Sequence, residues 1–130
     1  NSLRASGETL ATFYGQNMTY LKSGPMGIFP FQTQQFMDWR VLEQRGELEV
    51  YNLTDASLEA TLEITAVAPR GAKLVTANGQ RSQFAAGQMQ RWSLGPLRLE
   101  PGRNPVILED PRWGQSMEPL LISSVKVLTP

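Results

Sequence analysis

The chain has 130 residues, enough for one domain with its own hydrophobic core. Its 12 basic and 12 acidic residues give a net charge of zero, without a block of like charge, which argues against nucleic-acid binding and against electrostatic attachment to anionic lipid. The chain has no Cys and no His, so disulfides, thiol catalysis, Ser-His-Asp triads and conventional zinc sites are excluded within it. No apolar run reaches the roughly 18 to 20 residues that a membrane-spanning helix needs.

The first part of the chain predicts short strands separated by loops. We expect residues 1–7 to be a flexible lead-in and residues 8–130 to form a single domain. Residues 8–14 alternate as a first strand, and residues 17–21 are its expected partner. Glycine and proline then predict a loop over residues 22–27.

Residues 33–45 fit two secondary structures. A helix capped by Thr33 would carry one side-chain stripe, made of Phe36, Met37, Arg40, Val41 and Gln44. A strand would instead place Trp39 and Val41 on one face. We favour a strand from about Asp38, because Gly46 then leads directly into the next strand.

The clearest signal lies in residues 46–67. Apolar side chains occupy every second position of its later half, namely Leu58, Ala60, Leu62, Ile64 and Ala66, and Glu or Thr occupies the positions between them. Leu48 and Val50 alternate in the same way before a polar turn at residues 52–55. This period of two predicts two antiparallel strands of one sheet with a polar outer face.

The remaining residues continue the same pattern to the end of the chain. Residues 73–77 and 80–85 predict a hairpin, because Asn78-Gly79 supplies the positive φ angles of a type I′ turn. Residues 88–94 alternate before a turn at Gly95-Pro96, and strands follow at residues 105–109 and 120–128. Residues 110–119 form a loop that contains Trp113. About nine or ten short strands without a long helix predict an all-β, antiparallel β-sandwich of jelly-roll type.

Several short motifs resemble a known class of module. They are Gly27-Ile28-Phe29, Asp38-Trp39-Arg40, residues 46–52, Leu99-Glu100-Pro101-Gly102-Arg103-Asn104, and Asp110-Pro111 followed by residues 121–127. Their order resembles the extracytoplasmic β-sandwich modules of bacterial polytopic membrane proteins related to glycosyltransferases. The Leu-x-Pro-Gly-x-Asn turn is also similar to galactose-binding-like jelly rolls and carbohydrate-binding modules.

The resemblance implies a non-catalytic module outside the cytoplasmic membrane, tethered through another region of a larger membrane or surface protein. Its expected role is to bind carbohydrate or to position a substrate, with carbohydrate and other domains of the same polypeptide as partners. The alternative is a structural or protein-interaction domain without a small-molecule ligand. In that case residues 26–31, with Phe36 and Met37, are candidates for a partner contact.

A sugar site needs an aromatic ring flanked by hydrogen-bonding side chains, because sugars present both C–H faces and hydroxyls. Trp113 is the first candidate, since it lies in a loop with Arg112 and Gln115. Trp39 beside Arg40 is the second candidate, and Trp92 is the third. In each case the competing explanation is an aromatic ring that fills the core.

Acidic residues suggest two other kinds of site. Glu109 and Asp110 could hold a structural calcium ion, with Glu8 or Glu118 if the ends of the chain meet, and we expect no other cofactor. Glycoside hydrolysis needs a pair of carboxylates, which same-face neighbours on a strand can provide. The pairs are Glu59 with Glu63 and Glu47 with Glu49. Both pairs lie on regular polar faces, so we interpret them as solvent-facing scaffold residues.

Overall fold

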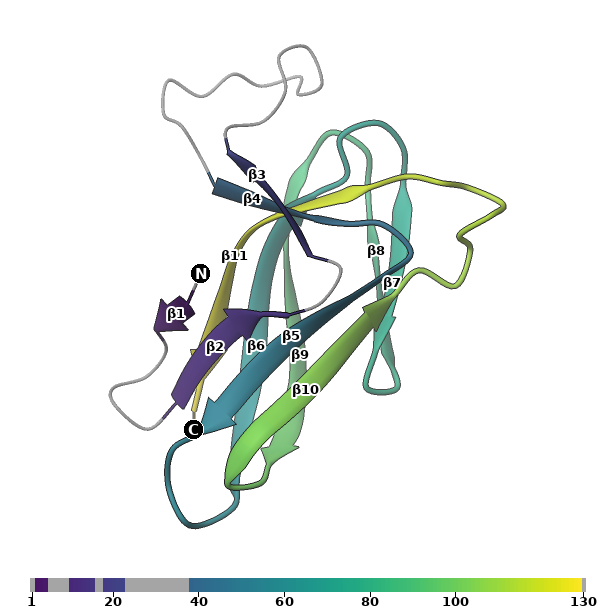
Figure 1. The fold of residues 1–130 in the computed structure, drawn as a ribbon. Coiled ribbons are helices and arrows are strands. Elements are labelled where there is room, and N and C mark those ends of the chain that lie inside the picture. Colours follow the sequence, from purple (N-terminus) through teal and green to yellow (C-terminus); the bar gives the residue numbers. More distant parts are fainter. Residues whose placement is uncertain (1, 5–9, 16–17, 23–37, 130) are drawn as a thin grey trace.

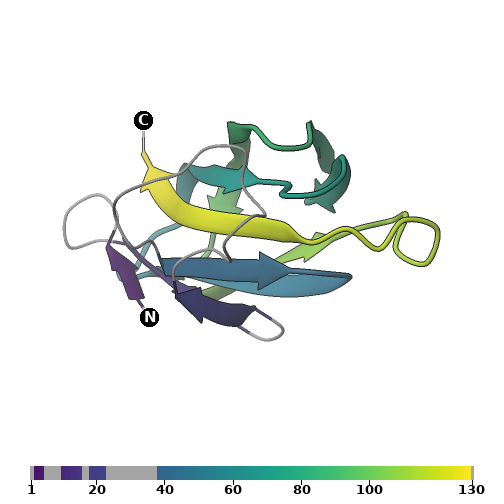
Figure 2. The same cartoon turned by 90° about the horizontal axis from the view of Figure 1, so that it is seen from above.

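The computed structural model describes residues 2–4, 10–15, 18–22 and 38–129. In these residues the chain forms two antiparallel β-sheets packed face to face, which confirms the predicted β-sandwich (Figures 1 and 2). The strands are β1 (Ser2–Arg4), β2 (Leu10–Tyr14), β3 (Thr19–Lys22), β4 (Asp38–Leu42), β5 (Arg45–Asn52), β6 (Leu58–Val67), β7 (Lys73–Ala77), β8 (Gln80–Phe84), β9 (Met89–Leu99), β10 (Gly102–Glu109) and β11 (Leu120–Leu128). The described part contains no helix that could cross a membrane.

The strand order shows how the chain builds the two layers. One sheet has the order β1-β2-β5-β10-β7-β8, and the other has the order β3-β4-β11-β6-β9. From β4 onward every connection except β7–β8 crosses from one sheet to the other, as in jelly rolls. Both sheets contribute inward side chains to one core, in which Leu48, Leu62 and Phe84 are fully buried.

The expected pairing of β5 with β6 is wrong. The two strands lie in opposite sheets: β5 pairs with β2 and β10, whereas β6 pairs with β9 and β11. The predicted alternation is nevertheless confirmed, because Leu48 and Val50 of β5 pack into the same core as Leu62 and Ile64 of β6. A period of two identifies the buried face of a strand, but it does not say whether the next strand lies beside it or across the core.

Three other local predictions also need correction. Strand β3 pairs with β4 and not with β2, so the segments around Gly15 are not a hairpin. Residues 2–4 of the expected lead-in form β1 and pair with β2. Gly95-Pro96 is not a turn, because β9 continues through it and the pairing with β6 shifts register between Ala60 and Leu62. A β-bulge accommodates Gly95 and Pro96, the two residues for which the sequence predicts a chain reversal.

Other local predictions are confirmed. A strand begins at Asp38, whereas residues 33–37 of the ambiguous segment lie outside the described residues, as do residues 26–31. The β7–β8 hairpin turns at Asn78 (φ 51°) and Gly79 (φ 76°), the positive angles that a type I′ turn requires. Residues 110–119 form a loop between β10 and β11.

Tyr14, at the end of β2, makes the stability of the fold sensitive to alkaline pH. Burial raises the pKa of Tyr14 to about 12, although the Arg40 guanidinium, 4.9 Å from the ring centroid, opposes the rise. Between the unfolded pKa of about 10 and the folded value, the folded chain keeps a proton that the unfolded chain has lost, so stability falls as pH rises. We therefore expect the free energy of unfolding to fall by about 2 kcal/mol across this window.

Tyr14→Phe has no ionisable hydroxyl and should remove this part of the alkaline loss. Denaturant unfolding on both sides of the window measures the difference, with Tyr51→Phe on the outer face of β5 as the control. An identical alkaline loss in Tyr14→Phe and the unmodified chain would contradict the assignment.

Candidate functional site

A buried ammonium group organises one end of the sandwich. Lys73 is the first residue of β7 and points inward with Val75 and Ala77, leaving Lys73 1% exposed. Its Nζ donates to Asp110 Oδ2 at 2.9 Å, to the Glu43 carbonyl at 2.7 Å and to the Glu118 carbonyl at 2.5 Å. These contacts join the β4–β5 turn, the end of β10 and the end of the 110–119 loop.

The three acceptors explain how the charge can be buried. An ammonium group has three N–H donors, and each of them has an oxygen partner here. Burial lowers the pKa of Lys73, while the hydrogen bond and the charge of Asp110 act in the opposite direction. A buried ion pair is tolerated when its donors and acceptors are satisfied. Removing one partner leaves the other charge buried, with nothing to compensate the cost of its desolvation.

The 110–119 loop is built on the same carboxylate. Asp110 Oδ1 accepts a hydrogen bond from the Arg112 backbone N–H at 2.8 Å, and the Trp113 N–H donates to the Asp110 carbonyl at 3.2 Å. The Gln115 and Ser116 N–H groups both donate to the Arg112 carbonyl, at 2.9 and 3.0 Å. Consecutive turns therefore shape the loop, as is typical after an Asp side chain that bonds the backbone two residues ahead.

The loop places Trp113 over the buried ammonium. Lys73 Nζ lies 4.8 Å from the centroid of the Trp113 ring, within the range of a cation–π interaction. Trp113 is partly exposed, whereas the Lys73 side chain has no exposed surface, so solvent reaches the ring away from the ammonium. Gln115 is exposed on the same loop, and Arg112 is partly exposed. Arg112 Nε is buried and has no hydrogen-bond partner among the described residues.

The other two tryptophans lie inside the protein. Trp39 is 2% exposed and packs with Val67 and Leu121. Trp92 is 8% exposed and meets Phe84 edge to face, with ring centroids 6.3 Å apart. Of the predicted sugar-binding residues, the structure therefore brings together Arg112, Trp113 and Gln115.

Arg40 lies apart from that loop. Its guanidinium covers the ring of Tyr14 and donates to the Met18 carbonyl at 3.1 Å. These contacts join β4 to the segments that precede it and do not bring Arg40 to the Trp113 ring.

The acidic candidates have local partners. Asp110 is engaged by Lys73, and Glu109 Oε2 lies 3.7 Å from Arg45 Nη1 on the surface. Across residues 2–4, 10–15, 18–22 and 38–129 there is no group of three His, Cys, Asp or Glu residues that could hold a metal ion. The structural calcium ion stays a prediction.

Glu47 and Glu49 share one arginine on the outer face of β5. Arg103 Nη2 lies 3.1 Å from Glu47 Oε1 and 2.8 Å from Glu49 Oε2. The hydrogen bond from Arg103 lowers the pKa of Glu49. A general acid of a glycosidase needs a raised pKa, so this environment favours a scaffold role for the pair. Glu59 is exposed on the outer face of β6, and Glu63 is partly exposed there.

Sequence reasoning missed Lys73, the residue that holds the candidate site together. The signal was present in the alternation of β7, where Lys73 occupies the parity of the buried Val75 and Ala77. A lysine at a core-facing position needs a partner that compensates its buried charge. The sequence near Lys73 does not reveal that this partner is Asp110.

Comparisons with known proteins show the fold alone. No protein-family model matches the sequence, and no curated protein matches it. A solved structure of a peptidoglycan O-acetylesterase is similar at 15% identity with a TM-score of 0.56, over 98% of this chain and 31% of that one. A GH26-CBM35 β-(1,4)-mannanase of Podospora anserina is similar at 18% identity with a TM-score of 0.52, over 94% of this chain and 28% of that one. The chain thus spans about a third of each similar structure.

Loss of the Lys73 ammonium should destabilise the fold strongly. Lys73→Met leaves the Asp110 carboxylate buried without its partner, and we expect a loss of about 3–5 kcal/mol in the free energy of unfolding. Arg70→Ala is the control, because its ion pair with Glu118 at 3.9 Å is largely exposed and should be worth less than about 1 kcal/mol.

Denaturant unfolding of Lys73→Met, Asp110→Asn and the double variant measures this coupling. The double variant should be less destabilised than the two single losses added together, because neither charge is then left alone. Additive losses would show that the two groups are not energetically coupled.

Proposed function

We propose that this β-sandwich is a non-catalytic, carbohydrate-binding module of a larger protein, located outside the cytoplasmic membrane. In this role it holds a glycan chain near another domain, which acts on the chain or is anchored to it. The observation that carries the proposal is the partly exposed Trp113 ring, supported from below by the Lys73 ammonium.

The chemistry of the loop suits a sugar ligand. A pyranose offers an apolar face of C–H groups, which an indole ring can cover, and hydroxyls around its edge, which amide and guanidinium groups can bind. Trp113 supplies the ring, while Gln115 and Arg112 supply the polar groups on the same loop. Because the loop is fixed by hydrogen bonds to Asp110, little ordering is needed when a ligand binds.

The comparisons are consistent with this proposal. Both similar structures come from proteins named for polysaccharides: a peptidoglycan O-acetylesterase in one case and a GH26-CBM35 β-(1,4)-mannanase in the other. The resemblance of the sequence motifs to extracytoplasmic modules supports the same location.

Replacing the ring should weaken glycan binding. We expect Trp113→Ala to reduce affinity at least tenfold, because loss of stacking and of buried apolar area costs about 1.5–3 kcal/mol. Isothermal titration with β-(1,4)-manno-oligosaccharides and with soluble peptidoglycan fragments provides the measurement. Met117→Ala is the matched control, since Met117 is 61% exposed on the same loop.

Unfolding curves must accompany the titration, because Trp113 also contacts Lys73. The cation–π interaction is worth about 1 kcal/mol, so Trp113→Ala should remain folded. Equal affinity of Trp113→Ala and the unmodified chain for every glycan that binds would overturn the proposal. Absence of binding to all of these glycans would favour a structural or protein-interaction domain.

The location outside the membrane has its own test. A reporter enzyme that is active only after export, fused directly after β11 in the full-length protein, should be active in bacterial cells. The same reporter fused to a cytoplasmic protein is the control. An inactive, stably expressed fusion would contradict an extracytoplasmic location.

A further inference from the structure

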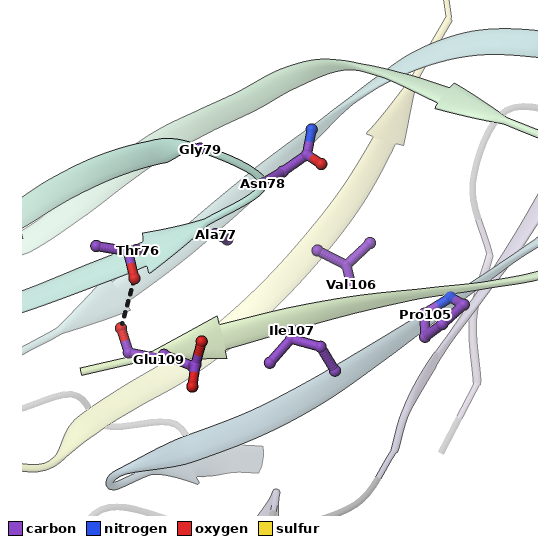
Figure 3. Close-up of a pocket in the computed structure, with 8 residues that line it drawn as sticks. All are labelled: Thr76, Ala77, Asn78, Gly79, Pro105, Val106, Ile107 and Glu109. Carbon is purple, nitrogen blue, oxygen red and sulfur yellow. Dashed lines mark hydrogen bonds between the residues drawn. The ribbon is translucent and has the colours of Figure 1, made fainter. Parts of the chain in front are cut away.

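Strands β7 and β10 overlap only near their ends, and a cleft lies between β10 and the tip of the β7–β8 hairpin. They are neighbours in the same sheet, yet their described pairing consists of one register pair, Glu109 with Thr76. The cleft has a volume of about 420 Å³, within the range of roughly 300–1,000 Å³ that is usual for small-molecule sites. Figure 3 shows Thr76, Ala77 and Asn78 on one side of it and residues of β10, from Pro105 to Glu109, on the other.

Backbone direction explains why this edge of β10 is open. Thr76 Oγ1 donates to the Glu109 carbonyl at 3.4 Å, whereas the Asp110 N–H points the other way and donates to the Gln44 carbonyl. Because alternate residues of an antiparallel strand bond to opposite neighbours, Ile107 and Pro105 present their backbone groups to the β7 side, as Glu109 does. Strand β7 ends at Ala77, so no described strand lies beside them there.

The other wall of the cleft is held away from β10 by the opposite sheet. Gln80, directly after the hairpin turn, donates through Nε2 to the Gly95 carbonyl at 2.8 Å, and its Oε1 accepts from the Gly95 N–H at 3.3 Å. This pair of bonds ties the hairpin tip to β9. A Cβ placed on Gly79 would meet no atom within 4 Å, so the tip borders open space. The cleft is therefore fixed on both sides before any ligand arrives.

The lining combines an apolar floor with separated polar groups. Ala77 and Val106 are buried at its base, and Pro105 and Ile107 extend the apolar surface toward solvent. The Asn78 side chain is exposed at the rim and makes no hydrogen bond to any other described residue. Among the residues that the structure describes, the Thr76 hydroxyl has only its long bond to Glu109, so both groups can still bind a ligand.

Pro105 decides between the two ligands that such a cleft could take. An added peptide strand would need a regular series of donors and acceptors along β10, and the proline removes the donor at the centre of the open edge. A sugar ring does not need that series. It needs an apolar patch and scattered hydroxyl partners, as this cleft provides.

We propose that the cleft between β10 and the β7–β8 hairpin is a second carbohydrate subsite, which binds one sugar residue of a glycan chain. The pyranose C–H face lies on Pro105 and Ile107, while Thr76 and Asn78 bind its hydroxyls. This inference rests on the proposed carbohydrate function, but it uses residues separate from the Trp113 loop. A module with both sites takes glycans in two places and binds a polymer more tightly than a short oligosaccharide.

Amide NMR of the isotope-labelled 130-residue chain tests the subsite directly, because each site reports on itself. The probes are β-(1,4)-mannohexaose and soluble peptidoglycan glycan fragments. At least one probe should shift the amide signals of Asn78, Gly79 and Ile107, and these shifts should persist in Trp113→Ala. If the Trp113 site does not bind sugar, the amide signals of the cleft should still shift. If the cleft does not bind sugar, only the amide signals of the Trp113 loop should shift.

The double variant Thr76→Val with Asn78→Gly should weaken binding at the cleft at least fivefold. Valine keeps the shape of threonine and glycine accepts the positive φ of Asn78, so the hairpin is retained. Arg81→Gln, exposed on β8 of the same hairpin, is the control and should bind normally.

Shifts confined to residues 112–115, or no shifts with any probe, would overturn the proposal. It would also be overturned by shifts at Ile107 that grow with protein concentration in the absence of sugar, because the open edge would then pair with a second copy of the chain.

Discussion

The ion pair between Lys73 and Asp110 connects the parts of this sandwich that matter most for its candidate site. The ammonium also bonds to the carbonyls of Glu43 and Glu118, and the carboxylate also bonds to the backbone of Arg112. A turn between two strands, the start of β7, the end of β10 and a ten-residue loop therefore share one buried charge pair. Because a buried charge is costly without its partner, these four segments must form together.

This arrangement gives the loop a fixed shape that its sequence alone would not provide. Loops with Gly and Pro are usually variable in conformation, and a tryptophan on a variable loop loses entropy when it binds a ligand. Here the Trp113 ring lies on the ammonium, and the turns that carry it begin at Asp110. In the proposed function, a structural ion pair thus supports the binding surface without touching the ligand.

The cleft between β7 and β10 depends on the contacts that the β7–β8 hairpin makes with two different strands. The hairpin β7–β8 is bonded to β10 near Thr76, but its tip is bonded to β9 of the other sheet through Gln80. The hairpin reaches its tip at Asn78-Gly79, so no described strand pairs with β10 on this side at Ile107 and Pro105. The proline lacks the N–H that a neighbouring strand would bind, so the open edge loses little.

Much of the fold could be predicted from the alternation of apolar and polar residues. The buried positions of β5, β6 and β9, the hairpin at Asn78-Gly79 and the loop around Trp113 all follow from patterns within about ten residues. The strand partners could not be predicted in the same way. β5 and β6 are consecutive and have the same alternating pattern, yet they face each other across the core. Likewise, β3 pairs with β4 and not with β2.

The sequence by itself determined which face of the main strands is apolar, because that face follows from local periodicity, and it identified Trp113, Arg112 and Gln115 as one group. Only the tertiary structure decided that Trp39 and Trp92 lie in the interior and that Trp113 remains partly exposed. It also decided that Asp110 is held by Lys73, which is 37 residues away in the chain. The physical reason is that exposure and ion pairing depend on which strands pack together, and that packing depends on residues distant from one another in the sequence.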